Sequence, residues 1–216
     1  MKTITMVIAV VAYASTSFAQ EKNTSEKLIF GVKAGVNYSN IYDTEGEDFQ
    51  ADGKLGLAGG AFLSIPIGEF LGIQPELLIS QKGFAADGTI LGTPYRFKRT
   101  TTHIDLPIFF VVKPARFLSV MAGPQYSYMV HRKDKFSSGS INLIQEQEFN
   151  NEDLRNNTLA FVLGADINYN HLVIGGRVGW DVVKNRKKSD SVVPRYRNTW
   201  IQATIGYRFY RETDES

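Results

Sequence analysis

Hydrophobic and polar residues alternate along most of the chain. From Leu28 to Tyr38 every second residue is apolar or aromatic, whereas the residues between them are small or polar. A period of two predicts a β-strand with one apolar and one polar face. Comparable runs cover 28–38, 55–65, 71–79, 102–112, 118–128, 159–169, 172–182 and 201–209. The pattern therefore predicts eight strands.

The connections between these runs differ in length. Tight turns at 67–70, 113–116 and 170–171 alternate with longer polar segments at roughly 39–53, 85–94, 132–156 and 184–197. Short turns at one end, long loops at the other and strands of about 9 to 11 residues are typical of outer-membrane barrels. We therefore predict an all-β fold, an eight-stranded antiparallel transmembrane β-barrel with up-and-down meander topology. The long segments would be extracellular and both termini periplasmic.

The first residues resemble a secretory signal. Lys2 precedes an apolar run over 4–12, and Ser17-Phe18-Ala19 provides a small-x-small cleavage site. The run is shorter than the roughly 20 residues of a spanning helix. We expect cleavage after Ala19, so that 1–19 form a signal peptide, 20–210 the barrel domain and 211–216 a short polar tail. The expected location is the outer membrane.

Composition narrows the classes of function. The chain has 24 basic and 22 acidic residues, so no basic surplus favours nucleic acid as a partner. It has no cysteine, which excludes disulfides, thiolate metal sites and cysteine nucleophiles. No residue pattern indicates a cofactor.

Several charged residues fall on the polar faces of the runs. An eight-stranded barrel has an interior just wide enough for side chains, so buried charges there must pair with one another. We expect Arg177 to reach Glu76, Asp105 or Asp181. A salt-bridged plug is the favoured interpretation, and a proton or ion path is the alternative. The predicted inward residues are Lys33, Gln74, Glu76, Lys82, His103, Asp105, Arg177 and Asp181.

Aromatic residues concentrate towards the ends of the runs, where they would meet lipid headgroups as interfacial girdles. This set is Tyr38, Tyr95, Phe97, Tyr126, Tyr128, Tyr169, Trp180, Trp200, Tyr207 and Phe209.

The long segments differ in charge. Segment 39–53 is acidic and segment 184–197 is basic. The two would attract one another across the mouth, or the basic segment would meet lipopolysaccharide phosphates, or both would be solvated.

The three histidines give little support for a metal site or a catalytic site. His103, His131 and His171 have no metal-ligand spacing. Ser127 and His131 would share an inward face if their strand continues that far, which is the one arrangement that suits a lipid-modifying enzyme at the barrel rim. No acid that would orient the imidazole is identified.

Several segments carry a family resemblance. The run 103–113, His-Ile-Asp-Leu-Pro-Ile-Phe-Phe-Val-Val-Lys, resembles the Leu-Pro strand of the PorT-like outer-membrane β-barrel family. The same family has strands similar to three further segments, 31–39, 122–128 and 164–166. The resemblance implies a barrel inserted by the outer-membrane assembly machinery, although Phe209, the aromatic that would signal assembly, is followed by 211–216. One founding member is associated with secretion, while most members have no assigned activity.

These observations predict a non-enzymatic outer-membrane barrel in contact with membrane lipids and lipopolysaccharide, whose loops bind an unidentified envelope or surface protein. The alternatives are the rim enzyme and a soluble periplasmic barrel around a lipophilic ligand. In the soluble barrel Lys33, Glu76 and Arg177 would face water.

Overall fold

The computed structural model describes residues 28–42, 50–90, 93–138, 141–148, 156–183 and 196–209. Among these residues, no helix is long and apolar enough to cross a membrane. The predicted signal peptide and polar tail lie outside the described residues. The strands are β1 (Ile29–Tyr42), β2 (Gln50–Pro66), β3 (Leu71–Ile90), β4 (Thr93–Ala115), β5 (Leu118–Ser138), β6 (Ile141–Glu148), β7 (Asn157–Tyr169), β8 (Leu172–Asp181) and β9 (Arg197–Phe209).

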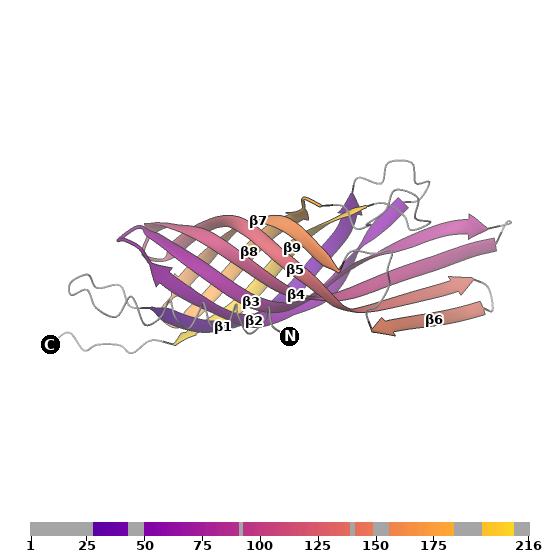
Figure 1. Ribbon diagram of the computed structural model, residues 1–216, viewed down its shortest axis with the longest axis horizontal. Coiled ribbons are helices and arrows are strands. Elements are labelled where there is room, and N and C mark those ends of the chain that lie inside the picture. The colour runs from indigo at the N-terminus through magenta and orange to yellow at the C-terminus, as the bar shows by residue number, and fades with distance from the viewer. Residues whose placement is uncertain are drawn as a thin grey trace.

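Eight of these strands close into a barrel (Figure 1). The order β4-β3-β2-β1-β9-β8-β7-β5 is closed by β4–β5 pairing, and every neighbouring pair is antiparallel. The first and last strands pair from Phe30 opposite Phe209 to Tyr42 opposite Arg197. A closed ring satisfies the backbone hydrogen bonds that a bilayer cannot. The predicted eight-stranded meander is confirmed.

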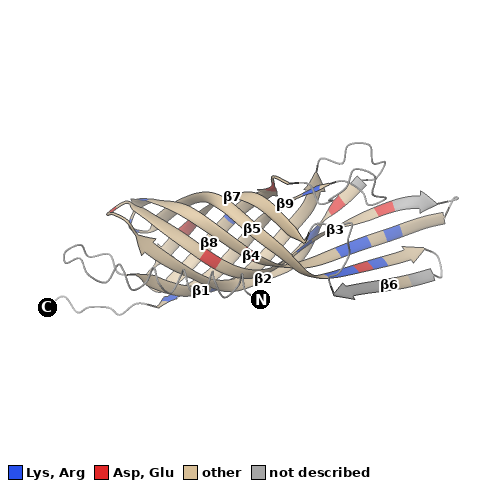
Figure 2. Cartoon of the chain, viewed as in Figure 1, with Lys and Arg blue, Asp and Glu red and all other residues tan. Residues whose placement is uncertain are grey.

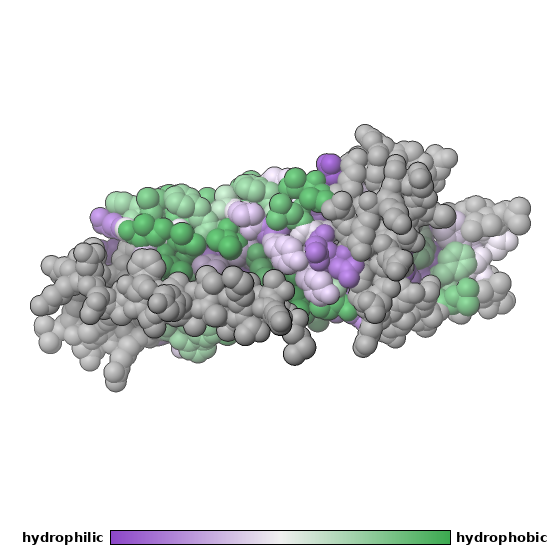
Figure 3. Space-filling view, viewed as in Figure 1, coloured by the Kyte–Doolittle hydropathy of each residue, from purple (hydrophilic) through white to green (hydrophobic). Residues whose placement is uncertain are grey.

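The apolar faces of the barrel strands point outward. Leu55 is 69% exposed and Ile79 62%, whereas Arg177 is 3% exposed. Hydrophobic side chains gather over the barrel (Figure 3), which forms a far larger exposed apolar surface than water-soluble monomers carry. The soluble barrel with an apolar interior is therefore wrong.

Three tight turns lie at one end of the barrel. They are 67–70, 116–117 and 170–171, and they share this end with the Phe30–Phe209 pair. Asn170 has a φ of 47°, a left-handed conformation that asparagine adopts more readily than most residues. The alternation of short and long connections is thus built into the barrel.

At the opposite end the predicted loops are partly strands. Segment 85–94 was expected to be a loop, but β3 continues to Ile90 and β4 starts at Thr93. Segment 132–156 was also expected to be a loop, yet β5 runs to Ser138 and β6 pairs with it alone. We call 84–90, 93–101, 131–138 and 141–148 the projecting sheet, which extends beyond the barrel (Figure 1). Beyond the bilayer the outward face of these strands meets water, while Phe84 and Ala86 face the interior, so the outward apolar face that marks membrane strands is lost.

Segments 39–53 and 184–197 are described only at their ends. β1 continues to Tyr42, β2 begins at Gln50, and 43–49 and 184–195 lie outside the described residues. The predicted attraction between the acidic and basic segments stays a prediction.

Candidate functional site

Four charged side chains form a neutral quartet inside the barrel. Lys33 Nζ lies 2.6 Å from Glu76 Oε1. Arg177 donates two hydrogen bonds to Asp166, of 2.6 and 2.9 Å, and its Nη2 lies 3.7 Å from Glu76 Oε1. All four residues are buried. Because an isolated buried charge costs several kcal/mol, the two cations and two anions stabilise each other.

Asp166 was not among the predicted inward residues. Of the three partners expected for Arg177, only Glu76 is near it, and the bidentate partner is Asp166. Alternation alone places Asp166 inward, because Leu163 and Ile167 on the same strand are outward and exposed. Glycines at 164 and 175 make the room, since a Cβ at either position would collide with the Arg177–Asp166 pair.

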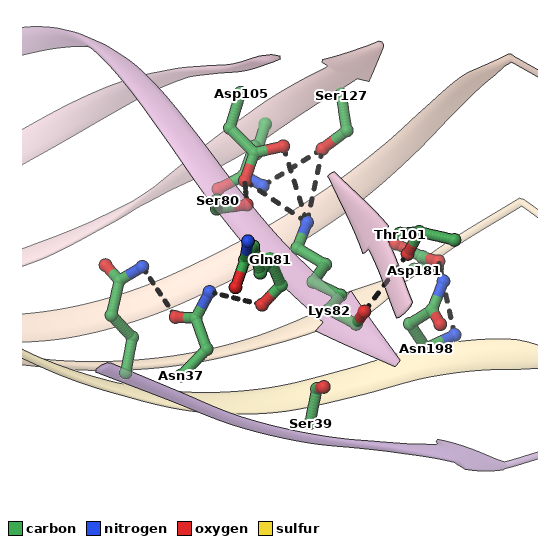
Figure 4. Close-up of polar contacts among 12 residues, drawn as sticks. Asn37, Ser39, Ser80, Gln81, Lys82, Thr101, Asp105, Ser127, Asp181 and Asn198 are labelled. Atoms are coloured by element: carbon green, nitrogen blue, oxygen red, sulfur yellow. Dashed lines mark hydrogen bonds and ion pairs between the residues drawn. The ribbon is translucent and has the colours of Figure 1, made fainter. Parts of the chain in front are cut away.

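A second polar cluster surrounds Lys82 (Figure 4). Its ammonium lies 3.3 Å from Asp105 Oδ2 and donates a 3.4 Å hydrogen bond to Ser127. Ser80 donates a 2.5 Å hydrogen bond to the same carboxylate. The ammonium also lies 3.9 Å from the ring centroid of Trp200, a favourable cation–π distance. This lysine is therefore held from several sides.

Asp181 and His103 complete the predicted set. Asp181 Oδ2 accepts hydrogen bonds of 2.5 Å from the Asn198 side chain and 3.2 Å from its backbone N–H. Asp181 Oδ1 and His103 Nδ1 are buried without a hydrogen-bond partner in the described part of the chain. The structure thus brings Lys33, Glu76, Lys82, His103, Asp105, Arg177 and Asp181 together in the interior.

Apolar side chains fill the space between the polar clusters. One cluster consists of Phe109, Val111, Met121, Ala160, Val162 and Trp200, and the Arg177 guanidinium lies 5.4 Å from the Phe109 ring centroid. A buried arginine above an aromatic face contributes packing as well as charge. Buried apolar side chains therefore lie between the polar clusters in the interior.

A third group caps the interior at the end of the projecting sheet. Phe84 and Tyr196 pack edge to face at 5.4 Å, with Ile41 and Ala86 beside them. Arg99 donates two 2.9 Å hydrogen bonds to Asp134 and one of 3.3 Å to Tyr196. Burial opposes the charge of Arg99, but Tyr196 and Asp134 outweigh it and raise the pKa of the guanidinium above its ordinary value. The cap is thus a charged pair set among aromatic rings.

The predicted girdle is mostly on the outer surface. Tyr38, Tyr126, Tyr128, Tyr169, Tyr207 and Phe209 are exposed, and Trp180 contacts Phe161 at 5.6 Å between ring centroids. The placement of Trp200 in the girdle is wrong, because it is 3% exposed and lies inside beneath Lys82. Ile201 points outward, and adjacent strand residues point to opposite faces, so Trp200 must point inward. Tyr95 and Phe97 belong to the projecting sheet.

The structure separates the predicted Ser127–His131 pair. His103 pairs with Met129 and Thr102 with His131, which leaves Val130 as a β-bulge. The extra residue changes the alternation of faces, so His131 leaves the inward face of Ser127. Ser127 instead accepts hydrogen bonds from Lys82 and from Gln125, the latter at 3.0 Å. Within the described ranges, no three potential ligands are grouped to hold a metal ion.

The family model for the outer membrane protein beta-barrel domain matches residues 18–180. The chain belongs to this family. The match agrees with the closed ring and the outward apolar belt, and together they establish an outer-membrane barrel protein. No curated protein matches the chain in sequence.

Three solved outer-membrane proteins align with the chain at low sequence identity. Ail, the attachment invasion locus protein of Yersinia pestis, is 15% identical with a TM-score of 0.45, and Neisserial surface protein A is 11% identical with 0.48. A major outer membrane protein of Thermus thermophilus is 15% identical with 0.47. Each comparison covers 85% of this chain and 100% of the other.

Proposed function

We propose that this protein is a non-conducting, non-enzymatic outer-membrane anchor that presents the projecting sheet at the cell surface. The observation that carries the proposal is the packed interior, in which the Arg177–Asp166 quartet, the Lys82 cluster and the Arg99–Asp134 cap follow one another. An eight-stranded barrel has little room beyond its side chains. Ions would have to displace paired charges to pass.

Conductance in a planar bilayer tests the plug. We expect no single-channel steps from the folded mature protein. A variant in which Lys33, Glu76, Asp166 and Arg177 are all replaced by Ala is expected to stay closed as well, because the Lys82 cluster and the Arg99–Asp134 cap still occupy the interior. Steady conductance by the wild type, with an ion selectivity that changes on Arg177→Gln, would instead establish a pore.

The projecting sheet is the part that we propose to contact an envelope or surface protein. Its strands β4 and β5 carry stacked rings of Tyr95 and Phe136, with centroids 5.6 Å apart, and β6 adds the 61% exposed Leu143. Replacement of 139–148 by a short turn would remove β6 but not the barrel. Cross-linking on intact cells is expected to lose its protein adducts in this variant, and unchanged adducts would place the contact elsewhere.

We propose that the chain is a PorT-like barrel, on the resemblance of segment 103–113. The proposal does not include a role in secretion. We also propose insertion by the outer-membrane assembly machinery, which the barrel class supports. Depletion of that machinery is expected to leave the protein unfolded, which an absence of heat-modifiable migration on a gel would reveal.

A further inference from the structure

Three lysines converge on the outer surface where the projecting sheet leaves the barrel. Lys98 on β4 stands directly opposite Lys135 on β5 in the strand register, and both are exposed. Lys54 on β2 reaches across to this row, where its ammonium hydrogen-bonds the Thr100 hydroxyl. Charged residues gather in this part of the chain (Figure 2).

The arrangement brings like charges close together. Like charges directly opposite each other on neighbouring strands repel. Burial, and then the charges of Lys98 and Lys135, lower the pKa of Lys54 below its ordinary value. None of the three forms an ion pair with a carboxylate of the described residues, and the nearby Asp87 accepts hydrogen bonds of 2.8 and 3.0 Å from Arg96.

The position of the cluster identifies the kind of anion. The exposed Leu55 and Ile79 belong to the apolar belt, and Ile104 lies opposite Tyr128 in the same belt. Thr100 is four residues from Ile104 in the direction of the projecting sheet. With a rise of about 3.4 Å per residue and a strand tilt of about 45°, the two residues are about 10 Å apart along the barrel axis. Long lysine side chains reach back from such a position to the headgroup layer.

We propose that Lys54, Lys98 and Lys135 form a binding site for the phosphate groups of a membrane glycolipid, the chemistry that lipid A of lipopolysaccharide provides. The acyl chains would lie on the apolar belt beneath, against Ile79 and its neighbours. The inference goes beyond the proposed function, since it holds whether or not the interior conducts ions.

Native mass spectrometry of the mature protein in non-ionic detergent tests the site. The probes are bisphosphorylated lipid A and the same lipid after removal of both phosphates. The variant is Lys98→Gln with Lys135→Gln, and the matched control is Lys113→Gln with Arg116→Gln, which removes two charges at the opposite end of the barrel. Heat-modifiable migration verifies that each variant is folded.

We expect the wild type and the control to retain bisphosphorylated lipid A, and the lysine variant to bind it about tenfold or more weakly, the effect of losing a charge-assisted contact. The dephosphorylated lipid is expected to bind the wild type as weakly as the intact lipid binds the variant. Equal binding by variant and wild type would overturn the site. Displacement of lipid A by an equal concentration of inorganic pyrophosphate would overturn the lipid as the source of phosphate.

Discussion

At the scale of single residues, the two kinds of ion pair in this protein are expected to differ in their contribution to stability. Arg177 and Asp166 are 3% and 5% exposed in their side chains, whereas Arg96 and Asp87 are 60% and 46% exposed. Removing one partner of a buried pair typically costs ~3–5 kcal/mol, because the other charge stays buried. Asp166→Asn should therefore lower the free energy of unfolding in lipid vesicles by that order.

Urea unfolding measures this difference, and Asp87→Asn is the matched control, for which little change is expected. Adding Arg177→Met to Asp166→Asn should recover much of the loss, since it removes the unpaired charge. Equal effects of the two single substitutions would contradict the assignment of Asp166 to a buried quartet.

The two tryptophans of the chain provide a second test at this scale. Trp180 points outward beside Phe161, while Trp200 is inside beneath Lys82. In vesicles of brominated lipid, the fluorescence of a Trp200→Phe variant, which keeps only Trp180, should be strongly quenched. A Trp180→Phe variant should be quenched little. Strong quenching of both would place Trp200 in the lipid and restore its girdle assignment.

At the scale of strands, alternation in the sequence predicted the barrel but not where its strands end. Inside the bilayer the outward face must be apolar, so inward and outward residues alternate strictly. The inward orientation of Asp166 and Trp200 can therefore be read from the outward apolar residues next to them. In the projecting sheet the outward face meets water, and the sequence of β6 carries no such period. The bulge at Val130 was also missed, because one extra residue leaves no local signature in composition.

This bulge determines which side chains of β5 face the cap. Beyond it Arg132 and Asp134 are buried, and Asp134 pairs with Arg99. Deletion of Val130 should exchange the two faces, turn Asp134 outward and separate it from Arg99. We expect trypsin to cleave the projecting sheet of this variant rapidly at its lysines. Val130→Ala keeps the bulge and should remain resistant, and equal resistance of the two variants would show that the bulge does not set the faces.

At the scale of the whole molecule, the two ends of the barrel differ enough to predict its orientation. One end has turns of a few residues together with the Phe30–Phe209 pair, and the other carries the charged projecting sheet (Figure 2). Outer-membrane barrels place short turns in the periplasm and long connections outside. An epitope inserted between residues 91 and 92 should therefore bind antibody on intact cells, whereas one added after Ser216 should bind only after permeabilisation. The reverse result would put the lysine cluster in the periplasm, where it would face the phospholipid leaflet instead of lipopolysaccharide.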